Sequence, residues 1–279
     1  MKSKLFWLVI ALLVIAIIFS VVNNKNIENG EFKPLELNVG DEFSYIDYGN
    51  TMYVLNYMME DTTGDGKKDM IIVIGEKGAV EDINAINMDI VVFEPVAEKF
   101  YNLKLKKFNG EMPRIETSEL NGDGVQDIVL KAVDENGNIL MRIASWNGEG
   151  FNEIFKAKDN KGIVFTGEFM DGFKVYLKCT KYNKEMNMDL LDRKENYVTN
   201  GFFDESGRLL KGGTKVSTSG FASVEFVQLD GYNGIQTVQR VIGFDSDDLL
   251  DELTVIWKYE NGKWSVKEAK GNVVGNLLY

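Results

Sequence analysis

The stretch EDTTGDGKKDMIIVIG, residues 60–75, places three aspartates and two glycines within nine residues, directly ahead of a strongly apolar run. A second copy, ELNGDGVQDIVLKA, follows at residues 119–132. Short runs rich in Val and Ile that follow Gly- and Asp-rich turns are typical of buried β-strands. Each stretch therefore predicts a polar turn that leads into a strand, and the second copy predicts a repeat.

The rest of residues 41–279 has mainly the two-residue alternation that is typical of β-strands, and no segment there shows a helical apolar stripe. Hairpins are predicted at residues 172–191 and 253–269, and the second contains the turn-forming pair Asn261-Gly262. Only three prolines occur, and no low-complexity tract separates a further domain. The pattern predicts one all-β domain.

The spacing of the blocks predicts a repeat of about 60 residues. The last aspartates of the two clean blocks are 58 positions apart, and a weaker third block lies at residues 243–251. One member would then be lost near residues 181–189, where the sequence predicts a hairpin instead. A further candidate at residues 228–236 is out of phase and has lost most of its carboxylates.

The side chains of both clean blocks suit Ca²⁺, which takes about six to eight oxygen ligands from carboxylates, amides and backbone carbonyls. Oxygen-bearing side chains occupy positions 1, 3, 5 and 9: Asp61, Thr63, Asp65 and Asp69, then Glu119, Asn121, Asp123 and Asp127. Glycine at position 6 (Gly66, Gly124) permits a sharp turn around an ion. Position 12 is apolar, so the blocks are not EF-hands. They predict two calcium sites, with two plain Asp-Gly turns as the alternative.

The pattern D-x-[DN]-G-D-G-x-x-D before an apolar strand resembles the calcium loop of FG-GAP and VCBS repeats, which build β-propellers of the integrin-α type. The wider arrangement is similar to uncharacterised membrane-anchored proteins of Gram-positive bacteria. This resemblance implies a β-propeller-like array of about four to five small blades, calcium in the loops and an extracytoplasmic location. The chain departs from the pattern at Thr63 and at Glu119.

Residues 1–26 differ in composition from the rest of the chain. Lys2 and Lys4 precede an apolar run at residues 5–22, which as a helix would be about 27 Å long, close to the roughly 30 Å of a bilayer core. A cleavable signal peptide usually has a shorter apolar region and an A-x-A cleavage site, and no such site is present here. The segment predicts one transmembrane helix, as an anchor or uncleaved signal.

The lysines ahead of the apolar run favour an orientation with the N-terminus inside. Residues 27–40 are then a linker, and residues 41–279 form the extracytoplasmic β-repeat domain of a single-pass cell-membrane protein. A secreted protein with a cleaved signal is the alternative.

Charge and composition exclude several functions. The net charge of −12 repels phosphate backbones, so nucleic acid is not an expected partner. The chain has no histidine, which excludes Ser-His-Asp and Cys-His catalysis. Cys179 is the only cysteine, so no intramolecular disulfide forms, and its apolar neighbours predict a buried thiol.

Three functions agree with these features. The first is a surface-anchored, calcium-binding module that binds or scaffolds a glycan, a wall polymer or a protein. The second is a polysaccharide hydrolase or lyase with paired carboxylates, although an exposed turn is the favoured interpretation of Asp251-Glu252. The third is a structural accessory of a membrane complex. Trp146, Trp257 and Trp264 are interpreted as cross-strand packing rather than sugar platforms.

Overall fold

The computed structural model describes residues 35–79 and 81–274. In this part the chain is mostly β: fifteen strands join in one open antiparallel sheet, accompanied by one short α-helix, α2 (Lys194–Thr199). Short 3-10 helices lie at Ala157–Lys161, Thr180–Tyr182, Leu191–Arg193 and Asn272–Val274. The prediction of a β-rich domain is confirmed. The described residues do not close into a propeller ring.

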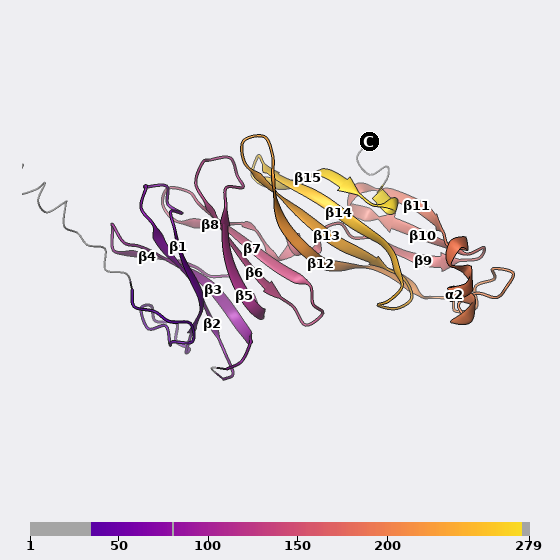
Figure 1. Cartoon of the computed structure of the whole chain (residues 1–279), viewed down its shortest axis with the longest axis horizontal. Coiled ribbons are helices and arrows are strands. Elements are labelled where there is room, and N and C mark those ends of the chain that lie inside the picture. Colours follow the sequence, from indigo (N-terminus) through magenta and orange to yellow (C-terminus); the bar gives the residue numbers. More distant parts are fainter. Residues whose placement is uncertain (1–34, 80, 275–279) are drawn as a thin grey trace, which may run out of the picture. The chain divides into compact units, whose positions relative to one another are not determined.

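The first four strands form an antiparallel meander (Figure 1). They are β1 (Tyr53–Glu60), β2 (Asp69–Glu76), β3 (Asn84–Glu94) and β4 (Lys99–Leu103). Seven of the eight residues of β2 are buried. Its sequence, DMIIVIGE, lacks polar alternation because neither face of this strand meets solvent.

A second meander repeats the first. Its strands are β5 (Gly110–Ser118), β6 (Asp127–Val133), β7 (Ile139–Trp146) and β8 (Phe151–Phe155). In both meanders the Asp-Gly block connects the first strand to the second, and its last aspartate pairs with the residue that ends the first strand. These pairs are Glu60 with Asp69 and Ser118 with Asp127. The two clean copies in the sequence are therefore equivalent in the structure.

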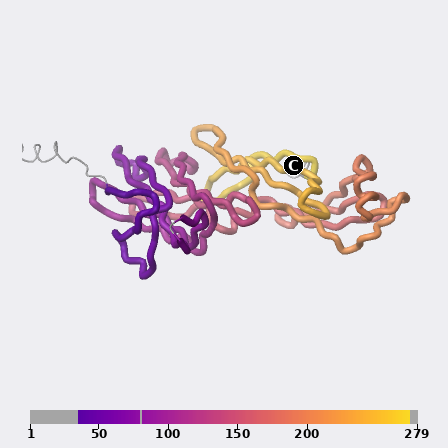
Figure 2. Tube along the Cα trace, turned by 60° about the horizontal axis from the view of Figure 1, so that its bottom comes forward, coloured from indigo at the N-terminus to yellow at the C-terminus, as the bar shows by residue number. Residues whose placement is uncertain are grey.

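A third meander follows near the end of the chain, coloured orange to yellow in Figure 2. It contains β12 (Lys215–Gln228), β13 (Asn233–Ile242), β14 (Leu249–Glu260) and β15 (Lys263–Lys270). Between the second and third meanders lie β9 (Thr166–Met170), β10 (Lys174–Cys179) and β11 (Lys184–Asp189), followed by α2. The predicted hairpins at residues 172–191 and 253–269 are both present, as β10–β11 and β14–β15.

Short joins make the sheet continuous. β3 meets β5 through two residue pairs, β7 meets β12 through one, and β9 meets β12 through two. Strands within one meander pair through many more residues than strands of different meanders do. Each meander is therefore a distinct unit of the sheet, and only a few backbone pairs join it to the next.

The buried side chains form two clusters, and β6 contributes to both. Ile128 and Leu130 pack in the cluster that includes Ile71 and Val73 of β2. Val129 belongs to the other cluster, which also contains side chains of the third meander. Successive side chains of a strand point to opposite faces. The second meander is therefore covered by apolar side chains on both faces, one set shared with the first meander and the other with the third.

Two details differ from the sequence-based expectation. The two-residue alternation predicts a strand at residues 42–48, but only an isolated bridge from Glu42 to Tyr53 forms there. β5 was not predicted, because GEMPRIETS contains a proline. Residues 181–189 are the turn and second strand of a hairpin, as the sequence predicts.

The predictions for the N-terminal region concern residues that lie mostly outside the described part of the chain. These are the anchor or uncleaved signal at residues 1–26, the membrane contact through residues 5–22, and most of the linker at residues 27–40. Within the part that the structure describes, no helix has the length and apolar character needed to cross a bilayer.

Candidate metal-binding loops

Residues 61–68 form the first loop, between β1 and β2. The carboxylate of Asp61 organises it, since Oδ1 accepts the Gly64 N–H at 2.7 Å and Oδ2 accepts the Gly66 N–H at 2.9 Å. Both glycines have a positive φ, +75° and +82°, a conformation that a side chain disfavours. Asp65 accepts the Lys67 N–H at 2.7 Å and is exposed. The glycines at positions 4 and 6 therefore let the chain wrap around the carboxylate at position 1.

Asp69, at position 9, is fully buried. Its Oδ2 accepts three hydrogen bonds, from the Thr62 N–H (2.8 Å), the Thr62 hydroxyl (3.0 Å) and the Thr63 N–H (3.0 Å). The Thr63 hydroxyl lies 3.5 Å from Oδ1. Burial raises the pKa of Asp69, and the bonds from the two threonines oppose that rise.

Residues 119–126 form the second loop, between β5 and β6. The Glu119 carboxylate accepts the Gly122 N–H, as Asp61 accepts that of Gly64. The Asn121 amide nitrogen then contacts both remaining carboxylates, Asp123 Oδ2 at 2.9 Å and Asp127 Oδ1 at 3.4 Å. The side chains at positions 3, 5 and 9 of this loop thus lie together.

Asp127, at position 9 of the second loop, is also buried. It is 1% exposed, its Oδ2 accepts the Leu120 N–H at 2.9 Å, and Ser145 is a further hydrogen-bond partner. Burial raises its pKa to about 7, with Asp123 and Glu119 adding to the rise and Ser145 opposing it. Loop one has Thr62 where loop two has Leu120, and leucine offers no hydroxyl. This substitution explains why the buried carboxylate of loop two has fewer donors.

The two loops lie against each other and against a third turn. A methyl group added at Gly64 would lie 2.8 Å from Val125 Cγ2, and one added at Gly122 would lie 3.6 Å from the ring of Tyr232. The Asn233 N–H donates to the Glu119 carbonyl at 2.9 Å. At Gly64, glycine is therefore needed for the close approach of loop two as well as for its φ, whereas at Gly122 the contact with Tyr232 is an ordinary van der Waals distance and only the φ favours glycine. Sequence reasoning missed this role.

The turn at residues 229–232 is the structural equivalent of the two loops. It connects β12 to β13, the first two strands of their meander, and the pair Gln228–Asn233 closes it. The out-of-phase candidate at 228–236 therefore occupies the repeat position. Residues 243–248 of the block predicted as the third copy lie instead between the second and third strands of the meander, and residues 249–251 begin β14. The block resembles the two loops in composition but not in its place in the meander, so its assignment as the third copy was wrong.

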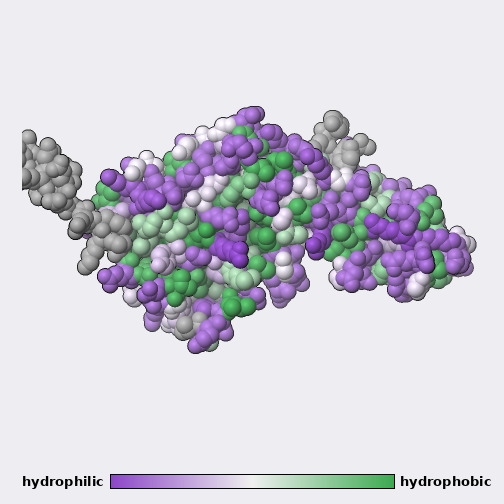
Figure 3. Space-filling view, in the orientation of Figure 1, coloured by the Kyte–Doolittle hydropathy of each residue, from purple (hydrophilic) through white to green (hydrophobic). Residues whose placement is uncertain are grey.

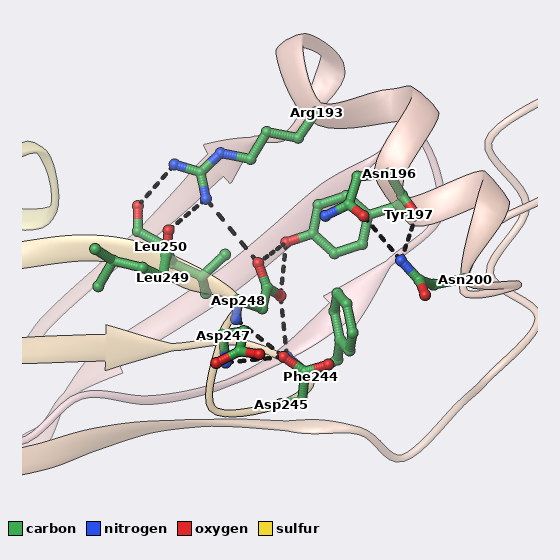
Figure 4. A network of polar contacts seen from close by, with 10 residues as sticks. All are labelled: Arg193, Asn196, Tyr197, Asn200, Phe244, Asp245, Asp247, Asp248, Leu249 and Leu250. Carbon is green, nitrogen blue, oxygen red and sulfur yellow. Dashed lines mark hydrogen bonds and ion pairs between the residues drawn. The ribbon is translucent and has the colours of Figure 1, made fainter.

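The acids of the 243–251 block have structural partners (Figure 4). The Tyr197 hydroxyl of α2 contacts both oxygens of buried Asp248, at 2.9 and 2.8 Å, and Arg193 lies 4.0 Å away. The Phe244 N–H donates to Asp248 Oδ2 at 3.0 Å. Burial and the neighbouring Asp248 raise the pKa of Tyr197, so the phenol stays protonated and remains a donor. This block fastens the β13–β14 loop to α2.

Replacing Tyr197 with phenylalanine is expected to lower the free energy of unfolding by about 1–3 kcal/mol, because buried Asp248 loses a donor. Urea unfolding followed by circular dichroism measures the change. Tyr57→Phe is the matched control, since Tyr57 is 39% exposed, and its expected change is within about 0.5 kcal/mol. Equal effects of the two substitutions would contradict this role of the hydroxyl.

The donor set of both loops fits a hard cation. A carboxylate has about four lone-pair sites, and the bonds to Asp61 occupy two of them. Among the described residues, none of Glu119, Asp123 and Asp127 has a cationic side chain within 4.0 Å. In the same part of the chain, no three acidic side chains converge tightly enough to form a complete metal site. A cation would thus draw the exposed position-5 carboxylates inward.

The remaining candidates are structural. Asp251 is 8% exposed and accepts the Val273 N–H at 2.8 Å, so the interpretation of an exposed turn is wrong for this residue. Cys179 is buried, as predicted.

The packing interpretation of the tryptophans is confirmed: Trp146 packs edge-on against Tyr101, and the Trp257 indole donates to Thr237 at 2.8 Å. Trp264 packs against Phe155 and Tyr259.

Comparison with known families finds one similarity. The YybI C-terminal domain matches residues 163–271, the segment that runs from just before β9 to the end of β15. No curated protein and no solved structure gave a significant match. The similarity covers the third meander and the strands that precede it. The two Asp-Gly loops lie outside the matched segment.

Proposed function

We propose that the chain is a calcium-binding β-repeat module that binds or scaffolds another molecule at the cell surface. Loop two would hold Ca²⁺ through Glu119, Asn121, Asp123 and Asp127, and loop one would do so through Asp61, Thr63, Asp65 and Asp69. The supporting observation is the buried Asp127 carboxylate, whose pKa is raised to about 7 by burial with two further acids beside it. A cation in this loop would neutralise that charge.

Calcium would act on the loops as a structural ligand. The carboxylate at position 5 lies in the middle of each loop and the one at position 9 begins the following strand, so a shared ion would fix the loop on the sheet. Loop one packs on Val125 of loop two, and loop two packs on Tyr232. An ion in either loop would therefore also stiffen the neighbouring loop or turn that packs against it. Binding energy of this kind contributes to folding stability.

The packing of the meanders supports the finer assignment of a propeller-like array. Each of the three meanders has four antiparallel strands, and apolar faces of successive meanders share buried clusters. The three meanders fall short of the four to five blades that the FG-GAP resemblance implies.

A membrane-anchored, extracytoplasmic location remains part of the proposal, because of the apolar run at residues 5–22.

A non-catalytic role fits the described acids better than a polysaccharide hydrolase. Asp251, the aspartate considered for catalysis outside the loops, and the nearby Asp248 are buried and accept structural hydrogen bonds. The space-filling view shows hydrophobic residues interspersed with hydrophilic ones on the face drawn, a surface suited to contact with a glycan, wall polymer or protein (Figure 3).

Direct calcium binding tests the proposal. Isothermal titration of the full chain with CaCl₂ is expected to show saturable binding that Asp123→Asn weakens by about tenfold or more. The Asp123 carboxylate is exposed and accepts the Val125 N–H at 2.8 Å, a bond that the asparagine oxygen can replace. Asp230→Asn is the matched control, because Asp230 is an exposed aspartate in the equivalent turn. Absence of saturable binding at millimolar Ca²⁺ would reject calcium as the ligand.

A further inference from the structure

A pocket lined by cationic side chains lies where the first two meanders meet. It has a volume of about 420 Å³. Its lining residues are Lys104, Lys106, Arg142, Glu153, Lys156, Ala157 and Lys158. Five cations thus surround one carboxylate, in a chain whose net charge is −12. The pocket shares no residue with either Asp-Gly loop, and its net positive charge is opposite to that of the whole chain.

The fold builds this pocket from two equivalent segments. Lys104 and Lys106 follow β4, the last strand of the first meander, and Lys156 and Lys158 follow β8, the last strand of the second. Tyr101 of β4 packs its ring against Trp146 and Phe151 of the second meander, with centroids 4.9 and 6.0 Å apart. This contact holds the two strands together, so the basic segments after them face one pocket.

The four lysines are exposed and lack carboxylate partners. Among the described residues, none of them has an acidic oxygen within 4.0 Å of its Nζ. Lys104 lies above the ring of Tyr48, 5.6 Å from its centroid, and buried Asp89 interacts with it electrostatically. Lys156 likewise interacts electrostatically with Glu153, and Asp159 acts on both Glu153 and Arg142. Lysines without a direct ion pair that converge on one concave site still form a local positive potential that attracts anions.

Arg142 is the fixed element of the pocket. Its side chain is 6% exposed, its Nε lies 2.9 Å from Glu153 Oε1, and its Nη1 donates to the Met141 carbonyl at 3.1 Å. The guanidinium also lies over the ring of Phe108, at 4.8 Å. These two polar contacts use two of its five N–H donors. The guanidinium is thus held rigidly at the pocket wall, whereas the lysines can adjust to a ligand.

We infer that this pocket binds an anionic ligand with two or more linked phosphate groups. The five cations of the lining outnumber its carboxylate Glu153 and the neighbouring Asp89 and Asp159 by two, which exceeds the charge that a single carboxylate ligand would neutralise. Arginine presents a fork that matches phosphate oxygens, and lysines add charge without a fixed geometry. The inference goes beyond the proposed calcium function and does not depend on it, because the pocket and the Asp-Gly loops share no residue.

Pyrophosphate is the probe for this site. The full chain is titrated calorimetrically at low ionic strength, in calcium-free buffer because pyrophosphate chelates Ca²⁺. We expect saturable binding that Lys106→Gln combined with Lys158→Gln weakens by about tenfold or more, since charged hydrogen bonds are lost. Lys107→Gln combined with Lys161→Gln is the matched control. It removes the same charge from the same two segments at positions outside the pocket, and its expected effect is about twofold or less.

Glu153→Gln supplies a test with the opposite sign. Glutamine removes the only carboxylate of the pocket lining and keeps an oxygen that can face Arg142, so pyrophosphate is expected to bind several-fold more tightly. A variant that merely loosened the fold would bind more weakly, and that result would overturn the proposal. So would the absence of saturable binding to the wild-type chain, or an equal loss in the two double variants. Circular dichroism verifies that each variant folds.

Discussion

Saturating calcium is expected to raise the free energy of unfolding by about 2.7 kcal/mol for each loop that binds it, at a concentration about 100 times the Kd. The gain arises because the ion binds the folded loop and not the unfolded chain. Urea unfolding of the full chain with Ca²⁺ and with a chelator measures it. Asp65→Asn and Asp123→Asn are each expected to remove the gain of one loop, while changing stability little in chelator.

The structure makes these two substitutions sharp tests. Both carboxylates are exposed, and each accepts one backbone N–H that the asparagine oxygen can also accept. Asp123 additionally accepts the exposed Asn121 amide at 2.9 Å, and losing this bond lowers stability equally with and without calcium. Their effect should therefore depend on calcium. Asp230→Asn serves as the control and is expected to leave the calcium gain unchanged. Identical unfolding curves with Ca²⁺ and with chelator would show that both blocks are plain turns, and the resemblance to calcium repeats would then concern topology alone.

The second large effect is a pH dependence caused by Asp127. Its folded-state pKa is about 7, well above the value of about 3.9 expected when unfolded. Between these values the folded state binds more protons than the unfolded state, so stability falls as pH rises from about 4 to about 7. In chelator, we expect this carboxyl to contribute a loss of at most about 4 kcal/mol over that range.

Asp127→Asn isolates this contribution. Asp69 and Asp89 also have pKa values raised by burial, and they contribute to the change of the free energy of unfolding with pH. The variant keeps their contributions and loses only that of Asp127. The measurement is the free energy of unfolding in urea at several pH values for both proteins. With calcium bound the sign of the Asp127 contribution should reverse, since protons then compete with the ion. Equal slopes for wild type and variant in chelator would contradict a raised pKa.

Local patterns were sufficient to find the repeat. The runs MIIVI and IVLKA became β2 and β6, and Asn261-Gly262 became the β14–β15 turn, with positive φ at both residues. These elements are decided by near neighbours in sequence, namely the period of the apolar residues and the φ that the turn requires. β5 escaped detection because most of its side chains are only partly buried and its composition is mixed.

The candidate site was only partly predictable. The spacing identified the eight side chains of the two loops but not Ser145 of β7, whose hydroxyl lies 2.6 Å from the Asn121 amide nitrogen. It also gave no sign that Tyr232 packs beside Gly122. The third repeat was misplaced because the acidic residues at 243–248 resemble the loops in composition, whereas the turn at 229–232, which occupies the equivalent place, has lost most of its carboxylates.

The sequence by itself determined the β-rich character, the polar turns and their oxygen-bearing side chains, because these depend on residue type and on contacts a few positions apart. Only the tertiary structure decided which turns are equivalent, which acids are buried, and that lysines at residues 104–106 and 156–158 meet beside Arg142. These features require strands far apart in sequence to lie side by side. The apolar faces of the meanders determine that arrangement, and it cannot be read from any single stretch of sequence.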